Sequence, residues 1–313
     1  MRRLILYTLL FITPFIVSIV VIEYLLREIP NSHMVKADEF QAKMKQTKII
    51  ILGNSHAANA INPDFLSKEA YNLAQGAQTL NIDYALLSKY QDQLDSLEYI
   101  IVSMSYHSPW FKLSDLEYFK WMGKYNNIYF DINIEHNPLK MFLFLDEPIK
   151  KDLEYIKLYY WNKRPITFNY INGFMPAPPA SDLKKIEKHA KDVAKGFTVQ
   201  DLTLRYNENL GYLTNIIEIA KKKHSKVIFI TIPCYPTYID NLNKEQLGSM
   251  HRLMDSIQNN EDVFYCDFLE DARSYTLEDF NNGDHLSYLG AQKVTFKVDS
   301  IIKEIEAKNI GKR

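Results

Sequence analysis

The chain begins with one long apolar stretch and then alternates between short apolar runs and amphipathic segments. The stretch, residues 4–22, holds 19 residues without a charge. At a rise of about 1.5 Å per residue, a helix of this length spans roughly the 30 Å of a bilayer's hydrocarbon core. The pattern therefore predicts a single transmembrane helix within residues 1–26.

A cleaved signal peptide is the alternative for this stretch, and it requires small residues at a cleavage site directly after the apolar part. Residues 23–27, EYLLR, do not supply them, and the small-residue pattern Val35-Lys36-Ala37 lies far downstream. We therefore expect an uncleaved anchor. Basic residues flank both ends of the stretch, but long domains translocate largely regardless of flanking charge. This favours an extracytoplasmic location, in the cell envelope, for the rest of the chain.

Beyond a polar stalk, residues 27–47, five apolar runs indicate strands that alternate with amphipathic helices. The expected strands are 48–52, 70–73, 98–104, 226–232 and 263–268. The expected helices are 80–94, 203–223, 244–257 and 289–306. Unbroken apolar runs are typical of parallel strands buried on both faces. The pattern predicts a three-layer α/β/α sandwich with a mainly parallel five-stranded sheet, whose functional site lies at the carboxyl ends of the strands.

The region 107–198 lacks this alternation and indicates an insertion in a domain that spans 48–307, followed by a basic tail at 308–313. The insertion carries all three tryptophans, Trp110, Trp121 and Trp161, in a chain that is 13% aromatic. Aromatic faces stack on sugar rings and also fill cores. We expect core packing for most of these side chains and single out Trp110 and Trp161 as candidate substrate-binding residues.

Composition excludes several classes of protein. With 47% hydrophobic residues and a formal net charge of -1, the chain is neither disordered nor basic enough to hold a phosphate backbone, so no nucleic acid partner is expected. Cys234 and Cys266 could form one bridge in an exported protein, or they could be two buried thiols. No cysteine or histidine spacing indicates a metal site, and no organic cofactor is implied.

The first expected strand is followed by Gly53-Asn54-Ser55-His56-Ala57. A glycine permits a tight strand-to-helix turn, and a serine on such a turn projects its hydroxyl above the sheet. Because a serine hydroxyl needs a base to take its proton, catalysis requires a histidine at the same sheet edge. His285 is suitable, since its loop directly precedes the last expected helix. His56 either contacts substrate or packs at the helix start.

Three blocks of sequence resemble the SGNH (GDSL-type) hydrolases. They are GNSH from Gly53, NLAQGAQ with Gly76, and DHLSYLGA from Asp284. The resemblance implies a flavodoxin-like sheet, Ser55 as nucleophile, His285 as general base, and the backbone N–H groups of Ser55 and Gly76 as oxyanion donors. The N-terminal anchor is similar to that of SGNH-like proteins that acetylate exported polysaccharides or handle D-alanyl groups on teichoic acids.

The chain departs from that family at three positions. Asn54 stands where the family has Asp, and Ser105 offers a hydroxyl where the family has an oxyanion-binding side-chain amide. Asn282 stands where the family has the Asp that orients the histidine. An Asn can hold a histidine, whereas replacing the Asp of a serine triad can cost about 10⁴ in rate. Either Asn282 or Asp284 could therefore orient His285.

These features predict a membrane-anchored serine esterase or O-acyltransferase that transfers or removes O-acetyl groups on an extracytoplasmic polysaccharide through a Ser55 acyl intermediate. Expected partners are a cell-envelope glycan, the membrane through the N-terminal helix, and an integral-membrane acyltransferase. The alternative, favoured by Asn282, is a catalytically impaired domain that serves as a glycan-binding or scaffold subunit of a membrane export complex.

Overall fold

The computed structural model describes residues 1–117, 119, 122–132, 134, 141–144, 149–259 and 261–310. The chain divides into two compact units. The anchor unit comprises Met1–Ala37 and Tyr118–Phe168, and the sheet unit comprises Asp38–Glu117 and Asn169–Arg313.

The sheet unit is built on five parallel strands in the order β2-β1-β3-β4-β5. The strands are β1 (Ile49–Leu52), β2 (Ala70–Asn72), β3 (Tyr99–Ser103), β4 (Lys226–Thr231) and β5 (Val263–Asp267). Each strand lies within one of the five apolar runs. In the register of the sheet, Ile50 of β1 lies between Tyr71 of β2 and Ile100 of β3. The predicted parallel sheet is confirmed.

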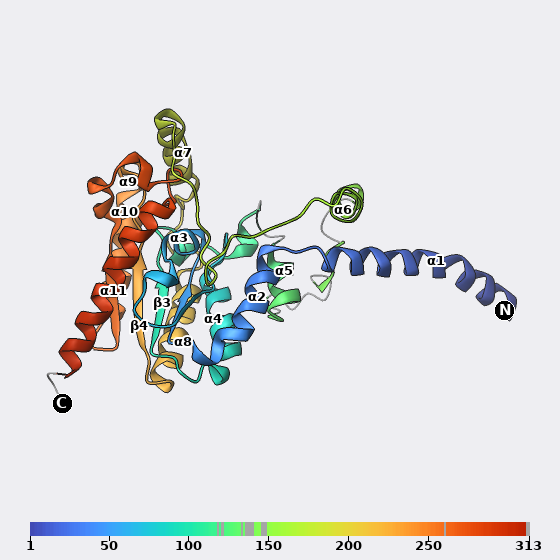
Figure 1. The fold of residues 1–313 in the computed structure, drawn as a ribbon, viewed down its shortest axis with the longest axis horizontal. Helices are drawn as coiled ribbons and strands as arrows, with labels where there is room; N and C mark the ends of the chain where they lie inside the picture. The colour runs from blue at the N-terminus through green and yellow to red at the C-terminus, as the bar shows by residue number, and fades with distance from the viewer. Residues whose placement is uncertain are drawn as a thin grey trace. The chain divides into compact units, whose positions relative to one another are not determined.

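Helices cover both faces of this sheet. One layer contains α3 (Ser55–Ala60), α7 (Leu183–Gly196), α9 (Pro236–Asp240) and α11 (Tyr288–Ile310). The other contains α4 (Leu80–Tyr90) and α8 (Tyr206–Lys222), while α10 (Lys244–Ile257) contacts β5. Ile49 and Ile51 pack in the core of the first layer, whereas Ile50 and Leu52 point to the opposite face and are also buried. Figure 1 shows α11 on one side of β3 and β4, and α4 and α8 on the other, as the predicted three-layer sandwich requires.

The turn after β1 lies where the strand order reverses, because β2 and β3 flank β1 on opposite sides. Crevices at such points hold the ligands of open α/β sheets. Gly53 makes this turn with a φ of +124°, and a Cβ at this position would lie 2.7 Å from the Cβ of Ser103. Glycine is therefore required here for both conformation and space.

The anchor unit contains α1 (Arg2–Arg27), α5 (Gly123–Tyr129), α6 (Ile149–Ile156) and a π-helical turn, Lys157–Trp161. Within the described part of the chain, α1 is the one helix long and apolar enough to cross a membrane. The charged end of α1 is held by its own unit. Arg27 pairs with Glu23 at 2.6 Å, and Glu23 accepts a hydrogen bond from the N–H of Leu143 at 2.8 Å.

The region expected to be a polar stalk, 27–47, instead contains a helix, α2 (Ser32–Lys43). Phe40 and Met44 lie one helical turn apart and are both buried. Phe40 packs edge-on against Tyr90 of α4, with ring centroids 5.2 Å apart. This tertiary packing stabilises a helix whose remaining positions are too polar to show it in the sequence.

The expected insertion, 107–198, is not one structural segment. Tyr118–Phe168 belongs to the anchor unit, whereas α7 belongs to the sheet unit. Ile186 and Ala190, one turn apart on α7, are buried in the core beside the sheet. The tryptophan-rich region is therefore divided between the two units.

Short 3₁₀ turns complete the described chain. They are η1 (Met44–Gln46), η2 (Pro63–Phe65), η3 (Gln91–Gln93), η4 (Ser108–Trp110), η5 (Leu113–Asp115), η9 (Leu269–Ser274) and η10 (Leu277–Asp279). The expected tail, 308–313, begins inside α11, and residues 311–313 lie outside the described part. Cys234 is buried, Cys266 is half-buried, and the two thiols are unpaired.

Candidate active site

Ser55 is the first residue of α3, directly after the Gly53 turn. Asn54 caps this helix, because its Oδ1 accepts a hydrogen bond from the N–H of His56 at 3.0 Å. Ser55 is half-buried, whereas His56 on the same turn is buried. The local fold therefore keeps the Ser55 side chain partly accessible and turns the His56 ring inward.

Ser55 and His285 lie 230 residues apart in the sequence and are in hydrogen-bond contact in the structure. Ser55 Oγ lies 2.7 Å from His285 Nε2. The loop that carries His285 is closed by a bridge between Phe280 and Leu286 and leads into α11. At this distance a neutral imidazole can accept the hydroxyl proton, as a nucleophile and its base require.

Both candidate orienting groups contact the far nitrogen of the His285 ring. Nδ1 lies 3.0 Å from Asn282 Oδ1 in hydrogen-bond geometry. Nδ1 also lies 2.9 Å from Asp284 Oδ1, which makes a close ion-pair contact but no aligned hydrogen bond. Asn282 Oδ1 also accepts the backbone N–H groups of Asp284 and His285. The amide thus receives the ring N–H, while the carboxylate supplies a negative charge beside it.

A second histidine holds the other oxygen of this carboxylate. His56 Nε2 lies 3.2 Å from Asp284 Oδ2, and both side chains are almost fully buried. Ser105 Oγ lies 2.9 Å from His56 Nδ1, and Asn54 Nδ2 donates to Ser105 Oγ at 2.9 Å. Because an ionised carboxylate can only accept hydrogen bonds, the ring proton of His56 sits on Nε2 facing Asp284, and Nδ1 of the neutral ring accepts from the Ser105 hydroxyl.

This network corrects two expectations. His56 is 4% exposed and both its ring nitrogens are bonded, so it does not contact substrate. Ser105 is buried, and its hydroxyl is used between Asn54 and His56, so it is not a free oxyanion donor. In both cases the sequence places the residue at the right sheet edge but does not reveal the direction of its side chain.

Electrostatics favour a neutral His56 beside an ionised Asp284. Burial lowers the pKa of His56, and this effect exceeds the opposing influence of Asp284. Burial also opposes ionisation of Asp284, but the adjacent His285 and His56 more than offset it and hold the pKa of Asp284 well below its ordinary value. A fixed negative charge therefore lies beside the His285 ring.

The two backbone groups expected to bind an oxyanion remain available. Ser55 begins α3, and Gly76 lies in the half-buried turn after β2. Among the described residues, neither backbone N–H has a hydrogen-bond partner. The turn is tied to the nucleophile turn because the N–H of Gln75 donates to the carbonyl of Gly53 at 3.1 Å. Their use as oxyanion donors stays a prediction.

The candidate tryptophans have very different environments. Trp110 is 1% exposed, and its Nε1 donates to the carbonyl of Leu202 at 2.8 Å. Its expected role in stacking on substrate is therefore wrong, because an enclosed ring cannot face a sugar. Trp161 is 84% exposed and belongs to the anchor unit. Trp121 lies outside the described residues.

Sequence reasoning missed a buried carboxylate beneath the nucleophile turn. Asp83 Oδ1 accepts hydrogen bonds from the N–H of Gly53 at 2.8 Å and from Gln78 Nε2 at 2.7 Å. Burial raises the pKa of Asp83 to about 7, against the opposing effect of these two donors. The sequence feature that could have revealed it is a carboxylate on the apolar face of an expected helix, because Asp83 shares a buried face of α4 with Leu87 and Tyr90.

His56, Asp284 and His285 also offer three potential metal ligands within 4.8 Å of one another. Their ring nitrogens and carboxylate oxygens already contact Ser55, Ser105, one another or Asn282. A metal ion on this set would break the hydrogen bond between Ser55 and His285 or that between His56 and Asp284. We therefore interpret the cluster as a hydrogen-bonded network.

Comparisons with known proteins give distant structural likenesses. No protein-family model matches the sequence, and no curated protein matches it. A Bacteroides fragilis protein provisionally named an acylhydrolase is similar with a TM-score of 0.44 and 11% sequence identity, over 89% of this chain and 100% of that chain. A Streptococcus pneumoniae protein provisionally named a platelet activating factor has a TM-score of 0.37 and 12% identity, over 88% of this chain and 94% of that chain. At these values the function has to be derived from the site itself.

Proposed function

We propose that this protein is a membrane-anchored, SGNH-like serine acyl enzyme that transfers or removes O-acetyl groups on an extracytoplasmic polysaccharide. The observation that carries the proposal is the 2.7 Å contact between Ser55 Oγ and His285 Nε2, with Asn282 Oδ1 3.0 Å from the far ring nitrogen. A nucleophile, a base and an orienting group in mutual contact are the parts that serine-dependent acyl transfer requires.

In the first half-reaction, Ser55 Oγ attacks the carbonyl carbon of an ester while its proton passes to His285 Nε2. The negative charge of Asp284 stabilises the resulting imidazolium. The tetrahedral intermediate breaks its bond to the leaving oxygen, which takes the proton from Nε2 and departs as an alcohol. Ser55 is left as an acetyl ester.

In the second half-reaction, a hydroxyl group attacks the acetyl carbonyl and gives its proton to His285 Nε2. The bond to Ser55 Oγ breaks, and Oγ recovers that proton. Water as the attacking group completes removal of the acetyl group, and a sugar hydroxyl completes its transfer. The same side chains serve both outcomes.

The membrane part of the proposal is supported by α1, whose apolar residues are exposed throughout residues 4–21. Apolar side chains exposed over such a length are suited to lipid. We propose that α1 anchors the sheet unit on the extracytoplasmic side, beside its glycan substrate. An integral-membrane acyltransferase is the partner class that would supply acetyl groups there.

The alternative is a catalytically impaired subunit that binds glycan or serves as a scaffold. The observation that favours it is the hydrogen bond from the His285 ring to an amide, Asn282, rather than to a carboxylate. Catalysis by the full chain distinguishes the two functions.

The test uses the full-length protein in detergent with p-nitrophenyl acetate, with and without a polysaccharide acceptor. We expect hydrolysis by the wild type and its loss in Ser55→Ala, while Ser300→Ala, which changes an exposed serine of α11, keeps wild-type turnover. Acetyl groups found on the polysaccharide only with an active Ser55 would establish transfer. Equal turnover by Ser55→Ala and the wild type would remove Ser55 from its role, and no turnover by the wild type would favour the scaffold.

A further inference from the structure

The described residues of the anchor unit leave an apolar face of α6 exposed. On α6, Ile149 and Leu153 lie one turn apart, and their exposed fractions are 58% and 49%. The following π-helical turn adds exposed Tyr160 and Trp161. Exposed apolar side chains gathered on one face of a short helix indicate a binding surface rather than ordinary solvent contact.

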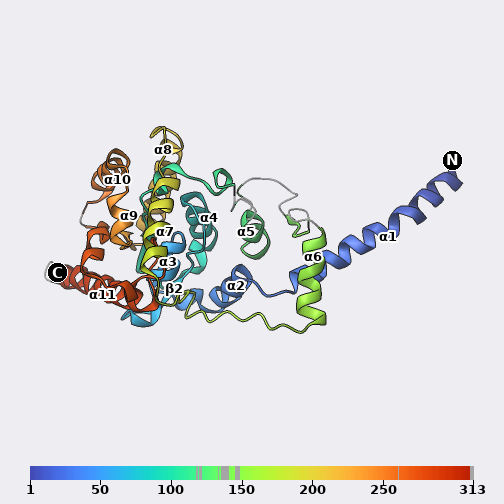
Figure 2. The same cartoon turned by 90° about the horizontal axis from the view of Figure 1, so that it is seen from above.

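This face lies beside the end of the candidate membrane span. The hydroxyl of Tyr160 donates to the carbonyl of Leu25, near the end of α1, at 3.0 Å. Glu23, the first charged residue after the apolar stretch, is held by the N–H of Leu143. Figures 1 and 2 show α6 end-on in one view and lengthwise in the other, so that it lies across the end of α1. A helix across the end of a membrane-spanning helix lies in the plane of the membrane surface.

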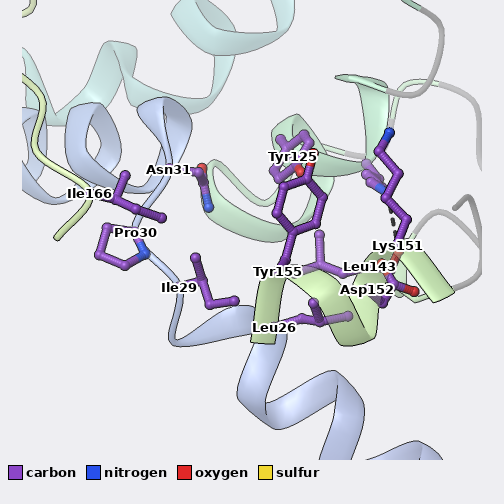
Figure 3. A pocket seen from close by; sticks show the side chains of 11 residues that line it. Leu26, Ile29, Pro30, Asn31, Tyr125, Leu143, Lys151, Asp152, Tyr155 and Ile166 are labelled. Carbon is purple, nitrogen blue, oxygen red and sulfur yellow. Dashed lines mark hydrogen bonds between the residues drawn. The ribbon is translucent and has the colours of Figure 1, made fainter. Parts of the chain in front are cut away.

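The other sides of α6 are occupied or polar. A cavity of about 290 Å³ separates α6 from neighbouring parts of the anchor unit, and Leu26, Tyr125 and Tyr155 line it. In Figure 3, Tyr155 extends from α6 toward Tyr125, away from the ribbon of α1. Asp152 is buried. Helical spacing therefore turns Leu153 away from the cavity and leaves it exposed.

Charge supplies the remaining feature of this surface. Residues 149–164, IKKDLEYIKLYYWNKR, contain five basic and two acidic residues. The five basic side chains are all exposed. Apolar and aromatic residues on one face with flanking basic residues are characteristic of helices that lie in the headgroup region of anionic membranes.

We propose that α6 and its π-helical turn form an interfacial membrane-binding element, with Ile149, Leu153 and Trp161 inserted among the headgroups of anionic lipids. The inference rests on the proposed membrane anchor. The anchor alone leaves its unit free to rotate about α1, and contact of α6 with the lipid surface fixes that orientation.

The test reconstitutes the full-length protein into vesicles of phosphatidylcholine and phosphatidylglycerol and measures the tryptophan emission that Trp161→Phe removes. We expect brominated lipids to quench this emission and aqueous iodide to leave it largely unchanged. Leu153→Glu should reverse both results. Leu183→Glu is the matched control, because Leu183 is 48% exposed on α7 in the sheet unit and should have no effect.

Three outcomes would overturn the inference in distinguishable ways. Quenching by iodide alone places Trp161 in water, and resistance to both quenchers places it against protein, such as a second copy or a membrane protein. In either case, retention of the chain in the membrane after alkaline carbonate extraction leaves the proposed anchor intact. Release of the chain by carbonate would overturn the anchor and the interfacial helix together.

A separate observation in the sheet unit assigns a positioning role to His56, and it rests on the proposed catalytic function. We infer that His56 holds Asp284 in the orientation that His285 requires. Its Nε2–H faces Asp284 Oδ2 at 3.2 Å, which leaves Oδ1 of the same carboxylate 2.9 Å from His285 Nδ1. On the other side of the ring, the Ser105 hydroxyl lies 2.9 Å from Nδ1 and donates to it.

Four other titratable groups face this pair. Burial and the charge of Asp284 raise the pKa of Cys234 and that of Tyr238 well above their ordinary values, so both stay neutral. The His107 ring meets the His56 ring edge-on at 6.0 Å, and burial together with the neighbouring His56 lowers the pKa of His107 to about 3, so it stays neutral. His189 Nδ1 lies 3.6 Å from Asp284 Oδ1 and accepts a hydrogen bond from the N–H of Gly283. His56 is therefore the buried imidazole whose N–H is directed at the carboxylate.

The test compares His56→Leu, which removes the donor, with His56→Gln, whose Nε2 can reach the same oxygen. We expect kcat to fall about ten- to hundredfold in His56→Leu with KM unchanged, because a hydrogen bond to a charged group is lost. The acid limb of the kcat/KM profile should move to lower pH, and His56→Gln should recover most of both effects. Wild-type kcat and pH profile in a folded His56→Leu would overturn this role, whereas an active Ser55→Ala would overturn the proposed function itself.

Discussion

The backbone N–H of Gly53 donates to Oδ1 of Asp83 at 2.8 Å, so the turn that precedes the nucleophile rests on a buried carboxyl group. Burial raises the pKa of Asp83 from its ordinary value of 3.8 to about 7. Between these two values the folded protein binds more protons than the unfolded chain. Stability therefore falls as the pH rises from about 4 to about 7, and this group alone contributes a loss of up to about 4 kcal/mol.

Asp83→Asn tests this linkage because an amide keeps an oxygen for Gly53 and does not ionise. We expect the variant to be more stable than the wild type above pH 7, with the difference shrinking toward pH 4. Urea unfolding midpoints across that range provide the measurement. Asp92→Asn, which changes an exposed residue of η3, should follow the wild-type curve. Parallel curves for Asp83→Asn and the wild type would contradict the raised pKa.

Asp284 and Asn282 make different contributions to the His285 ring. We expect Asp284→Asn to lower kcat by about 10²- to 10⁴-fold, because the imidazolium loses the negative charge beside it. Asn282→Asp keeps an acceptor oxygen for the ring N–H, so its kcat should stay within about tenfold of the wild-type value. Initial rates on p-nitrophenyl acetate measure both effects. A larger loss in Asn282→Asp than in Asp284→Asn would show that the amide is the essential orienting group.

Gly53 should tolerate no side chain. Its φ of +124° and the 2.7 Å approach to Ser103 predict that Gly53→Ala destabilises the protein by about 2–4 kcal/mol and abolishes esterase activity. Gly211→Ala is the control, because a Cβ there meets nothing within 4 Å and lies inside α8. This control should stabilise the protein by about 0.5–1 kcal/mol. Thermal and urea unfolding of the two variants would test the contrast.

Trp110 should matter for folding and not for substrate binding. Trp110→Phe leaves the Leu202 carbonyl without its donor and a gap in the core, so we expect a loss of about 1–3 kcal/mol in the free energy of unfolding. The KM for ester substrates should not change. Trp161→Phe changes an exposed ring and should alter stability by less than about 0.5 kcal/mol. A raised KM in a stable Trp110→Phe would contradict the buried position.

The five strands, the helices α4, α8, α10 and α11 of the sheet unit, and the candidate membrane span could be predicted from the amino-acid pattern, whereas α7 could not. These elements show in the local pattern of apolar residues. A strand such as Ile49–Leu52 is covered on both faces, and all its residues are therefore apolar. Ser55 and His285 could be selected for a related reason. Ser55 follows an expected strand and His285 precedes an expected helix. The ends of these two elements meet at one edge of a parallel sheet.

The direction of side chains within that edge could not be predicted, because it depends on contacts between residues distant in the sequence. His56 turns inward because Asp284, 228 residues further along the chain, accepts a hydrogen bond from its Nε2–H. The far nitrogen of His285 meets both Asn282 and Asp284 because the loop folds both side chains against one ring. Trp110 and Trp161 are both tryptophans of one aromatic-rich region of the sequence. Trp110 is nevertheless enclosed in the sheet unit, whereas Trp161 is exposed in the anchor unit. Periodicity reports which face of an element is covered, and only three-dimensional packing decides which polar atoms meet there.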